Sequence, residues 1–138
     1  MKFLLDTNTC IIYMRGKNST LKQKLESTAT KDIAVCSIVK AELFYGAMKS
    51  ANPQRNLTLQ QQFLAQFTSL PFDDLAATTF GTIRSQLEAL GTPIGAYDLQ
   101  IAAITMTNNL TLITHNTREF QRINNLLIED WEIYRSPK

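Results

Sequence analysis

The sequence predicts an α/β fold in which helices cover both faces of a parallel β-sheet, and three observations favour it. Short apolar segments that suit buried strands alternate with helical patterns along the chain. Strands separated by helices are joined by crossovers, which makes neighbouring strands parallel. The 138 residues, 44% of them hydrophobic, are enough to bury a core of this kind, and we expect one domain over residues 1–138.

The N-terminal half is predicted to alternate short strands with capped helices. A buried strand at 2–5 is followed by a helix that Thr7 or Asn8 caps, that runs to about Arg15 and that Gly16 ends. Apolar spacing, a β-branched run and the break at Asn52-Pro53 predict the other elements: a short helix within 17–31, a strand at 33–36, a helix over 37–48, a helix over 54–67 and an edge strand at 69–72.

The C-terminal half contains the clearest helical pattern. Apolar residues recur every three or four positions over 74–90, and Gly91 ends this helix. The remaining predictions are a loop at 92–97, a helix from about Asp98 to Thr107, a turn at 108–109, strands at 110–114 and 126–128, and fraying of the last few residues, which end in Ser136-Pro137-Lys138.

Charge and composition exclude few functions. A net charge of +2 permits nucleic-acid binding without arguing for it. The longest apolar runs fall short of the roughly 18 residues that a membrane helix needs, and MKFLLD is too short for a secretory signal. Cys10 and Cys36 lie in apolar runs without a CxxC pair, which favours reduced core thiols. We therefore expect a cytoplasmic protein without a membrane partner.

Three carboxylates differ from the other acids because apolar sequence surrounds them. Asp6 is the only charge between residues 3 and 14, Glu42 shares its apolar segment with Lys40 alone, and Asp98 is the only charge in PIGAYDLQIAAITMTNNLTLIT. A buried carboxylate without a partner costs several kcal/mol. The other acids sit in polar company and are predicted to be solvated surface charges, among them Glu26, Asp73, Asp74, Glu88 and Glu119.

The isolated acids are predicted to meet at one edge of the sheet. Sites in open parallel sheets form at the carboxyl ends of the strands. Asp6 and Asn116 each follow a predicted strand, Glu42 lies about one turn into the helix after the strand at 33–36, and Asp98 opens the helix that leads into the strand at 110–114. Clustered carboxylates need a cation, and hard oxygen ligands favour Mg²⁺ or Mn²⁺. The chemistry favoured is phosphodiester hydrolysis.

Each acid taken singly has a simpler interpretation. Asp6 would cap the helix by accepting from amides near Thr9, and Asp98 would sit favourably in the first turn of its own helix. Two other functions also remain open: a binding module that holds RNA or a protein without cutting, and a receiver-type phosphoacceptor, which the single acid after the first strand and the missing late-strand lysine disfavour.

Four segments resemble the motifs of PIN-domain proteins, and among these the VapC toxins of prokaryotic type II toxin–antitoxin pairs. The segments are LLDTNTCIIYM, KAELFYGAMKS, GTPIGAYDLQIAA and LITHNTREFQRI, and the resemblance covers the chain from Phe3 to about Trp131. It implies a three-layer α/β/α fold with a central parallel sheet of four to five strands, and a Mg²⁺- or Mn²⁺-dependent endoribonuclease.

The resemblance also implies roles for particular residues. The family's three acids fall on Asp6, Glu42 and Asp98, which would hold the metal, and its fourth position falls on Asn116. Many PIN domains carry Asp at that fourth position, so one ion and two ions both remain open here. Supporting roles would fall on Asn8, which would orient Asp6 or a metal-bound water, and on Thr114 as a nearby hydroxyl.

The family further implies partners: a VapB-type antitoxin, a homodimer that forms a heterotetramer or larger complex with it, and operator DNA bound only through the antitoxin. Lys40 and Arg84 are candidate RNA contacts, although Arg84 also stands four residues before Glu88 and would pair with it. His115, the only histidine, adjoins Asn116, and its role is left open.

Overall fold

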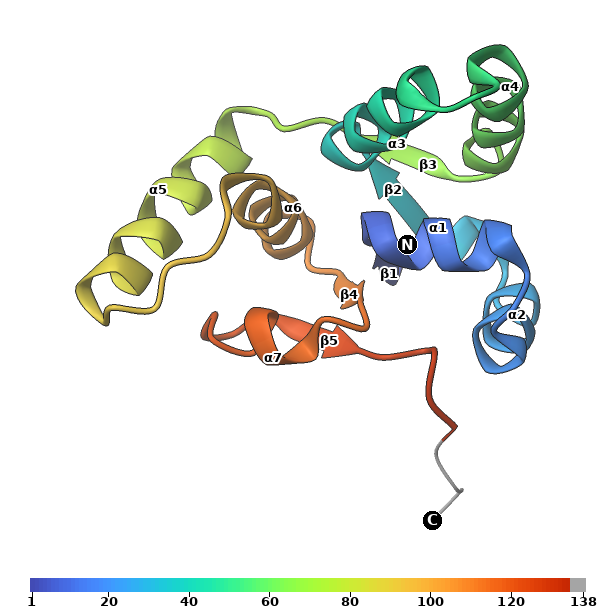
Figure 1. Ribbon diagram of the computed structural model, residues 1–138. Coiled ribbons are helices and arrows are strands. Elements are labelled where there is room, and N and C mark those ends of the chain that lie inside the picture. Colours follow the sequence, from blue (N-terminus) through green and yellow to red (C-terminus); the bar gives the residue numbers. More distant parts are fainter. Residues whose placement is uncertain (135–138) are drawn as a thin grey trace.

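A five-stranded sheet, all of it parallel, lies at the centre of the computed structural model, which describes residues 1–134 (Figure 1). The strand order is β3-β2-β1-β4-β5. The strands are β1 (Phe3–Leu5), β2 (Ile33–Cys36), β3 (Thr68–Leu70), β4 (Thr111–Ile113) and β5 (Leu127–Glu129). The predicted α/β class with a parallel sheet is confirmed, and the sheet has five strands.

Helices follow the strands and flank the sheet. Helix α5 packs against α6, and α3 packs against α1, α4 and α6. Their bounds are α1 (Thr7–Arg15), α2 (Ser19–Glu26), α3 (Ser37–Lys49), α4 (Pro53–Leu64), α5 (Asp74–Ala89), α6 (Ala96–Thr107) and α7 (Thr117–Phe120), with a 3₁₀ turn, η1, at Thr30–Asp32.

The register of the sheet places the carboxyl ends of β1 and β4 side by side. Leu4 pairs with Ala34 of β2 on one side and with Leu112 of β4 on the other. The amide of Asp6 donates to the carbonyl of Ile113 at 3.1 Å, just beyond the last ladder pair. The chain therefore leaves β1 at Asp6 beside the point where it leaves β4.

The core is built from strand residues and the helices packed on them. Leu4, Leu5 and all of β2 are buried, and so is the run from Ile101 to Ile104 in α6. Cys10 and Cys36 are buried and free, as the sequence predicts. Within residues 1–134 no helix is long and apolar enough to span a membrane.

Several element boundaries differ from the predictions. Helix α6 begins at Ala96 because Gly95 occupies its N-cap position, so Asp98 lies inside the first turn. Helix α4 ends at Leu64, three residues early, and the edge strand β3 covers Thr68–Leu70. The sequence patterns missed η1 and α7, which are too short for a helical period to show. The fraying expected after residue 134 lies outside the described residues.

Candidate active site

Asp6 is both a helix cap and a buried acid. It directly follows β1, its side chain is 5% exposed, and its Oδ1 accepts from the amide of Thr9 at 2.8 Å. Burial raises the pKa of Asp6, while hydrogen bonds from Thr114 and Thr9 oppose the rise and the charge of Glu42 adds to it. The predicted helix cap is therefore confirmed, and it leaves the Asp6 carboxylate at the edge of the sheet where a site is predicted.

Glu42 is held toward the same edge by a hydroxyl from another helix. It is half-buried in the second turn of α3, and Thr7 at the start of α1 donates to its Oε1 at 2.7 Å. This hydrogen bond joins residues 35 positions apart. It fixes the Glu42 carboxylate next to the segment that carries Asp6.

Asp98 faces other carboxylates. Burial raises its pKa to about 7, with further contributions from the charge of Glu119 and a hydrogen bond with it, and then from the charges of Glu42 and Asp6. The three predicted acids therefore lie within electrostatic reach of one another, together with a fourth.

That fourth acid, Glu119, corrects a prediction. Its polar neighbours suggested a solvated surface charge, but it is half-buried in α7 and near enough to Asp98 to raise the pKa of that carboxyl group. Its Oε2 accepts from Asn116 Nδ2 at 2.7 Å. A spacing of three residues from Asn116 on one helical turn was the signal that would have placed Glu119 at the site.

Thr114 and Asn116, in the segment that follows β4, support the acids. Thr114 is fully buried, bonds Asp6, and accepts from the Asn116 amide at 3.0 Å. Asn116 is exposed, and its amide side chain orients Glu119. Asn8 is exposed in the first turn of α1, and no hydrogen bond within residues 1–134 joins its side chain to the acids.

The two candidate RNA contacts are not drawn into the acid group. Arg84 Nε lies 3.3 Å from Glu88 Oε1, and both side chains are more than half exposed on α5. This is the i,i+4 pairing that the sequence offered as the simpler interpretation. Lys40 is half-buried in the first turn of α3.

The acid group fits a divalent cation by its donor chemistry. Within the described residues, Asp6, Glu42, Asp98 and Glu119 form no ion pair with a lysine or arginine. The charges of Glu119, Glu42 and Asp6 raise the pKa of Asp98, and a bound cation would offset this repulsion. Oxygen donors of this kind suit Mg²⁺ or Mn²⁺. We refer to these four residues as the acid group.

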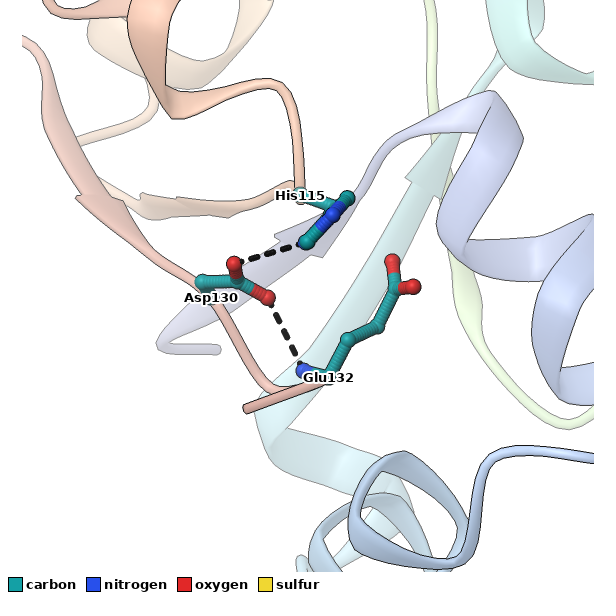
Figure 2. A group of neighbouring side chains, drawn as sticks. All are labelled: His115, Asp130 and Glu132. Atoms are coloured by element: carbon teal, nitrogen blue, oxygen red, sulfur yellow. Dashed lines mark hydrogen bonds and ion pairs between the residues drawn. The ribbon is translucent and has the colours of Figure 1, made fainter. Parts of the chain in front are cut away.

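A second cluster lies beside it. In residues 1–134, the side chains of His115, Asp130 and Glu132 bring three ligand atoms within 4.8 Å of one another, and no three members of the acid group do so (Figure 2). Asp130 follows β5, the edge strand next to β4. Sequence reasoning missed this cluster because Asp130 and Glu132 stand in a polar segment.

Comparison with known proteins finds a matching family and several relatives of this chain. The family described as the PIN domain matches residues 3–126. A tRNA(fMet)-specific endonuclease VapC from Salmonella typhimurium is 40% identical over 131 residues, covering 95% of this chain and 98% of that protein. Ribonuclease VapC2 from Haemophilus influenzae is 37% identical, with the same two coverages.

Solved structures agree with this similarity. The DNA-bound VapBC structure from Salmonella typhimurium matches with a TM-score of 0.90 and 40% identity, over 95% of this chain and 98% of that one. VapBC2 from Rickettsia felis, bound to a DNA fragment from its promoter, matches with a TM-score of 0.88 and 36% identity, over 95% and 99%.

Proposed function

The chain belongs to the PIN-domain family and to its VapC ribonucleases, and from this premise we propose that it is a divalent-metal-dependent endoribonuclease toxin whose acid group performs the cleavage. One observation carries the assignment of the site. The charges of Glu119, Glu42 and Asp6, which come from separate elements, act on Asp98, and no lysine or arginine of the described residues pairs with any of the four.

The proposed mechanism gives each residue a task. Asp6, Glu42 and Asp98 hold the cation, with Glu119 beside Asp98. A bound Mg²⁺ or Mn²⁺ supplies positive charge that polarises the scissile phosphoryl group and lowers the pKa of the attacking water. Thr7 and Thr114 orient the carboxylates of Glu42 and Asp6, and this set of hydrogen bonds is in place before substrate arrives.

The proposed hydrolysis is a displacement at phosphorus. Water adds to the phosphorus of a phosphodiester while the bond to the leaving ribose oxygen breaks. A carboxylate or solvent takes a proton from the water, and a solvent proton goes to the leaving oxygen. A cation held by the acid group would offset the negative charge that develops on the phosphoryl oxygens. The first RNA to test is the initiator tRNA, because the relatives at 40% and 38% identity are named as tRNA(fMet)-specific.

The partner is a VapB-type antitoxin, with operator DNA bound through the complex, as in the VapBC structures solved with DNA. We further propose a homodimer that assembles with the antitoxin as a heterotetramer or larger complex. A cytoplasmic location follows from the proposed RNA substrate.

Single amide substitutions test the site. Asp6→Asn and Asp98→Asn keep the shape of each side chain but remove a charge that holds the cation, so we expect cleavage of tRNA in Mg²⁺ to fall by at least roughly 100-fold. Glu88→Gln, which removes an exposed acid on α5, serves as the matched control and should cut at the normal rate. Cleavage by both Asp variants near the wild-type rate would show that the acid group is not the active site.

Chelation separates the enzyme from a non-cleaving binding module. EDTA should abolish cleavage, and added Mg²⁺ or Mn²⁺ should restore it. A module that only binds RNA would give no cleavage under any of these conditions and would retain its RNA affinity in EDTA.

A further inference from the structure

His115 and Asp130 form a pair that the proposed mechanism does not use. His115 Nδ1 lies 2.8 Å from Asp130 Oδ2, and the other oxygen, Oδ1, accepts from the amide of Glu132 at 2.9 Å (Figure 2). Both oxygens of Asp130 are therefore committed. The carboxylate cannot turn without losing a hydrogen bond, so it restrains the orientation of the imidazole ring.

The exposure of the pair is one-sided. The Asp130 side chain is 5% exposed, whereas the His115 side chain is 59% exposed. Glu132, the third member of the cluster, keeps its Oε2 out of solvent. The surface thus presents the imidazole, whose Nε2 forms no hydrogen bond within residues 1–134, while the Asp130 carboxylate and one oxygen of Glu132 are withdrawn from solvent.

The pair also adjoins the acid group. His115 stands between Thr114, which bonds Asp6, and Asn116, which bonds Glu119. Asp130 directly follows β5, which pairs with β4. The ring is therefore held on the same edge of the sheet by the ends of two neighbouring strands.

RNA that reaches the acid group brings phosphates toward a cluster of carboxylates. The cation accounts for the scissile phosphate, but phosphates next to it in the strand need donors from the protein. A histidine held by a buried carboxylate offers such a donor without exposing the carboxylate.

We propose that His115 contacts a backbone phosphate of the RNA through Nε2, next to the scissile phosphate, and that Asp130 is the positioning residue that holds the ring for this contact. The inference rests on the proposed function, since it places the RNA strand across the acid group.

The charges around the ring support this role. The hydrogen bond and charge of Asp130 raise the pKa of His115, with smaller contributions in the same direction from Glu132 and Asp6 and an opposing one from burial. The imidazolium, which carries a proton on both nitrogens, thus persists to higher pH than in a free histidine.

RNA affinity in an uncut complex tests the contact. We would measure the dissociation constant of single-stranded RNA by fluorescence anisotropy in the Asp98→Asn background. His115→Gln should weaken binding roughly fivefold and lower the salt slope of log K by about 0.7, the value for one phosphate contact on a single strand. Lys31→Gln is the matched control, because it removes an exposed cation before β2, at the opposite edge of the sheet.

Asp130 should act only through His115. Asp130→Asn should weaken RNA binding alone but add nothing to His115→Gln, and His115→Arg should keep tight binding with or without Asp130. Binding should weaken as pH rises through the pKa of His115, which NMR can follow because the chain has one histidine. That pH step should be missing in His115→Gln and lie at lower pH in Asp130→Asn.

The outcomes distinguish three cases. If His115→Gln leaves both the affinity and the salt slope unchanged, the inference is wrong, whether or not the protein cuts RNA. A second case requires three results together: micromolar Zn²⁺ shifts the His115 ring signals in Asp98→Asn protein, Glu132→Gln abolishes that shift, and RNA affinity does not depend on His115. The cluster is then a cation site, and the inference is wrong. If RNA binding depends on His115 but wild-type protein cuts no RNA in Mg²⁺, only the proposed function fails.

Discussion

Glu119 is the residue whose position most changes the chemistry of the acid group. After burial, Glu119 contributes most to the raised pKa of Asp98. Its Oε2 accepts a hydrogen bond from the side chain of Asn116. A fourth carboxylate strengthens the attraction for a cation without having to be a direct ligand.

Substitution of Glu119 should therefore change metal dependence. Glu119→Gln leaves the shape intact but removes one negative charge, so the Mg²⁺ concentration for half-maximal cleavage should rise roughly tenfold, with a smaller change at saturating Mg²⁺. A Mg²⁺ titration of tRNA cleavage measures this, with Glu88→Gln as the control. An unchanged titration midpoint would assign Glu119 to the surface, as its sequence context first suggested.

The residues that sequence reasoning found and missed differ in their neighbours. Asp6, Glu42 and Asp98 were predictable because a lone charge in an apolar segment needs a partner. Glu119 and Asp130 lie in polar segments, where solvent suffices and a carboxylate needs no partner. Only the packing of α7 and β5 beside β4 brings these two carboxylates to partners in the fold. Thr7 was missed for a related reason: its bond to Glu42 spans 35 positions.

At the scale of an element, the first turn of α1 does two jobs. Asp6 caps the helix through the amide of Thr9 and belongs to the acid group. The turn that orients the carboxylate is therefore also the turn that the carboxylate stabilises.

Two substitutions at Asp6 separate these jobs. Asn caps a helix about as well as Asp, but Ala does not, so Asp6→Ala should be less stable than Asp6→Asn by about 1 kcal/mol while neither variant cuts RNA. Urea unfolding of the two variants measures the difference. Equal stabilities would mean that the cap contributes nothing beyond the packing of α1.

Long elements were predicted better than short ones. The apolar period over 74–90 located α5 almost to its ends, since sixteen residues contain several turns of the pattern. Helix α7 has four residues, too few for a period, yet it carries Glu119 to Asp98. The start of α6 was shifted by Gly95, which has no side chain to signal a cap.

At the scale of the whole molecule, strand order explains why the acids meet. β1 lies between β2 and β4 in the sheet. After β1 the chain adds β2 and β3 on one side of it, and then returns to add β4 and β5 on the other side. Sites in open parallel sheets form where the strand order reverses in this way. Asp6 leaves the sheet at this point, flanked by α3 with Glu42 and by the segment after β4.

The same convergence makes stability depend on pH and metal. The pKa of Asp98 is raised to about 7 and that of Asp6 is also raised, so the folded protein binds more protons than the unfolded chain above pH 4. In EDTA, stability should therefore fall as pH rises from about 4 to about 7. For a half-buried group screened by solvent the loss from Asp98 is on the order of 1–2 kcal/mol, or roughly 5 °C in Tm.

Thermal unfolding in EDTA at pH 5 and pH 8 measures this effect, with Asp98→Asn as the comparison. His115, whose pKa is also raised, loses stabilisation in the same direction as pH rises, so the diagnostic quantity is the part of the Tm difference that Asp98→Asn removes. Mg²⁺ binds only the folded acid group and should raise Tm at pH 8 more than at pH 5, where protons compete for the same carboxylates. An equal Tm difference between pH 5 and pH 8 in wild type and Asp98→Asn would mean that burial and the neighbouring carboxylates do not raise the pKa of Asp98 in the folded protein.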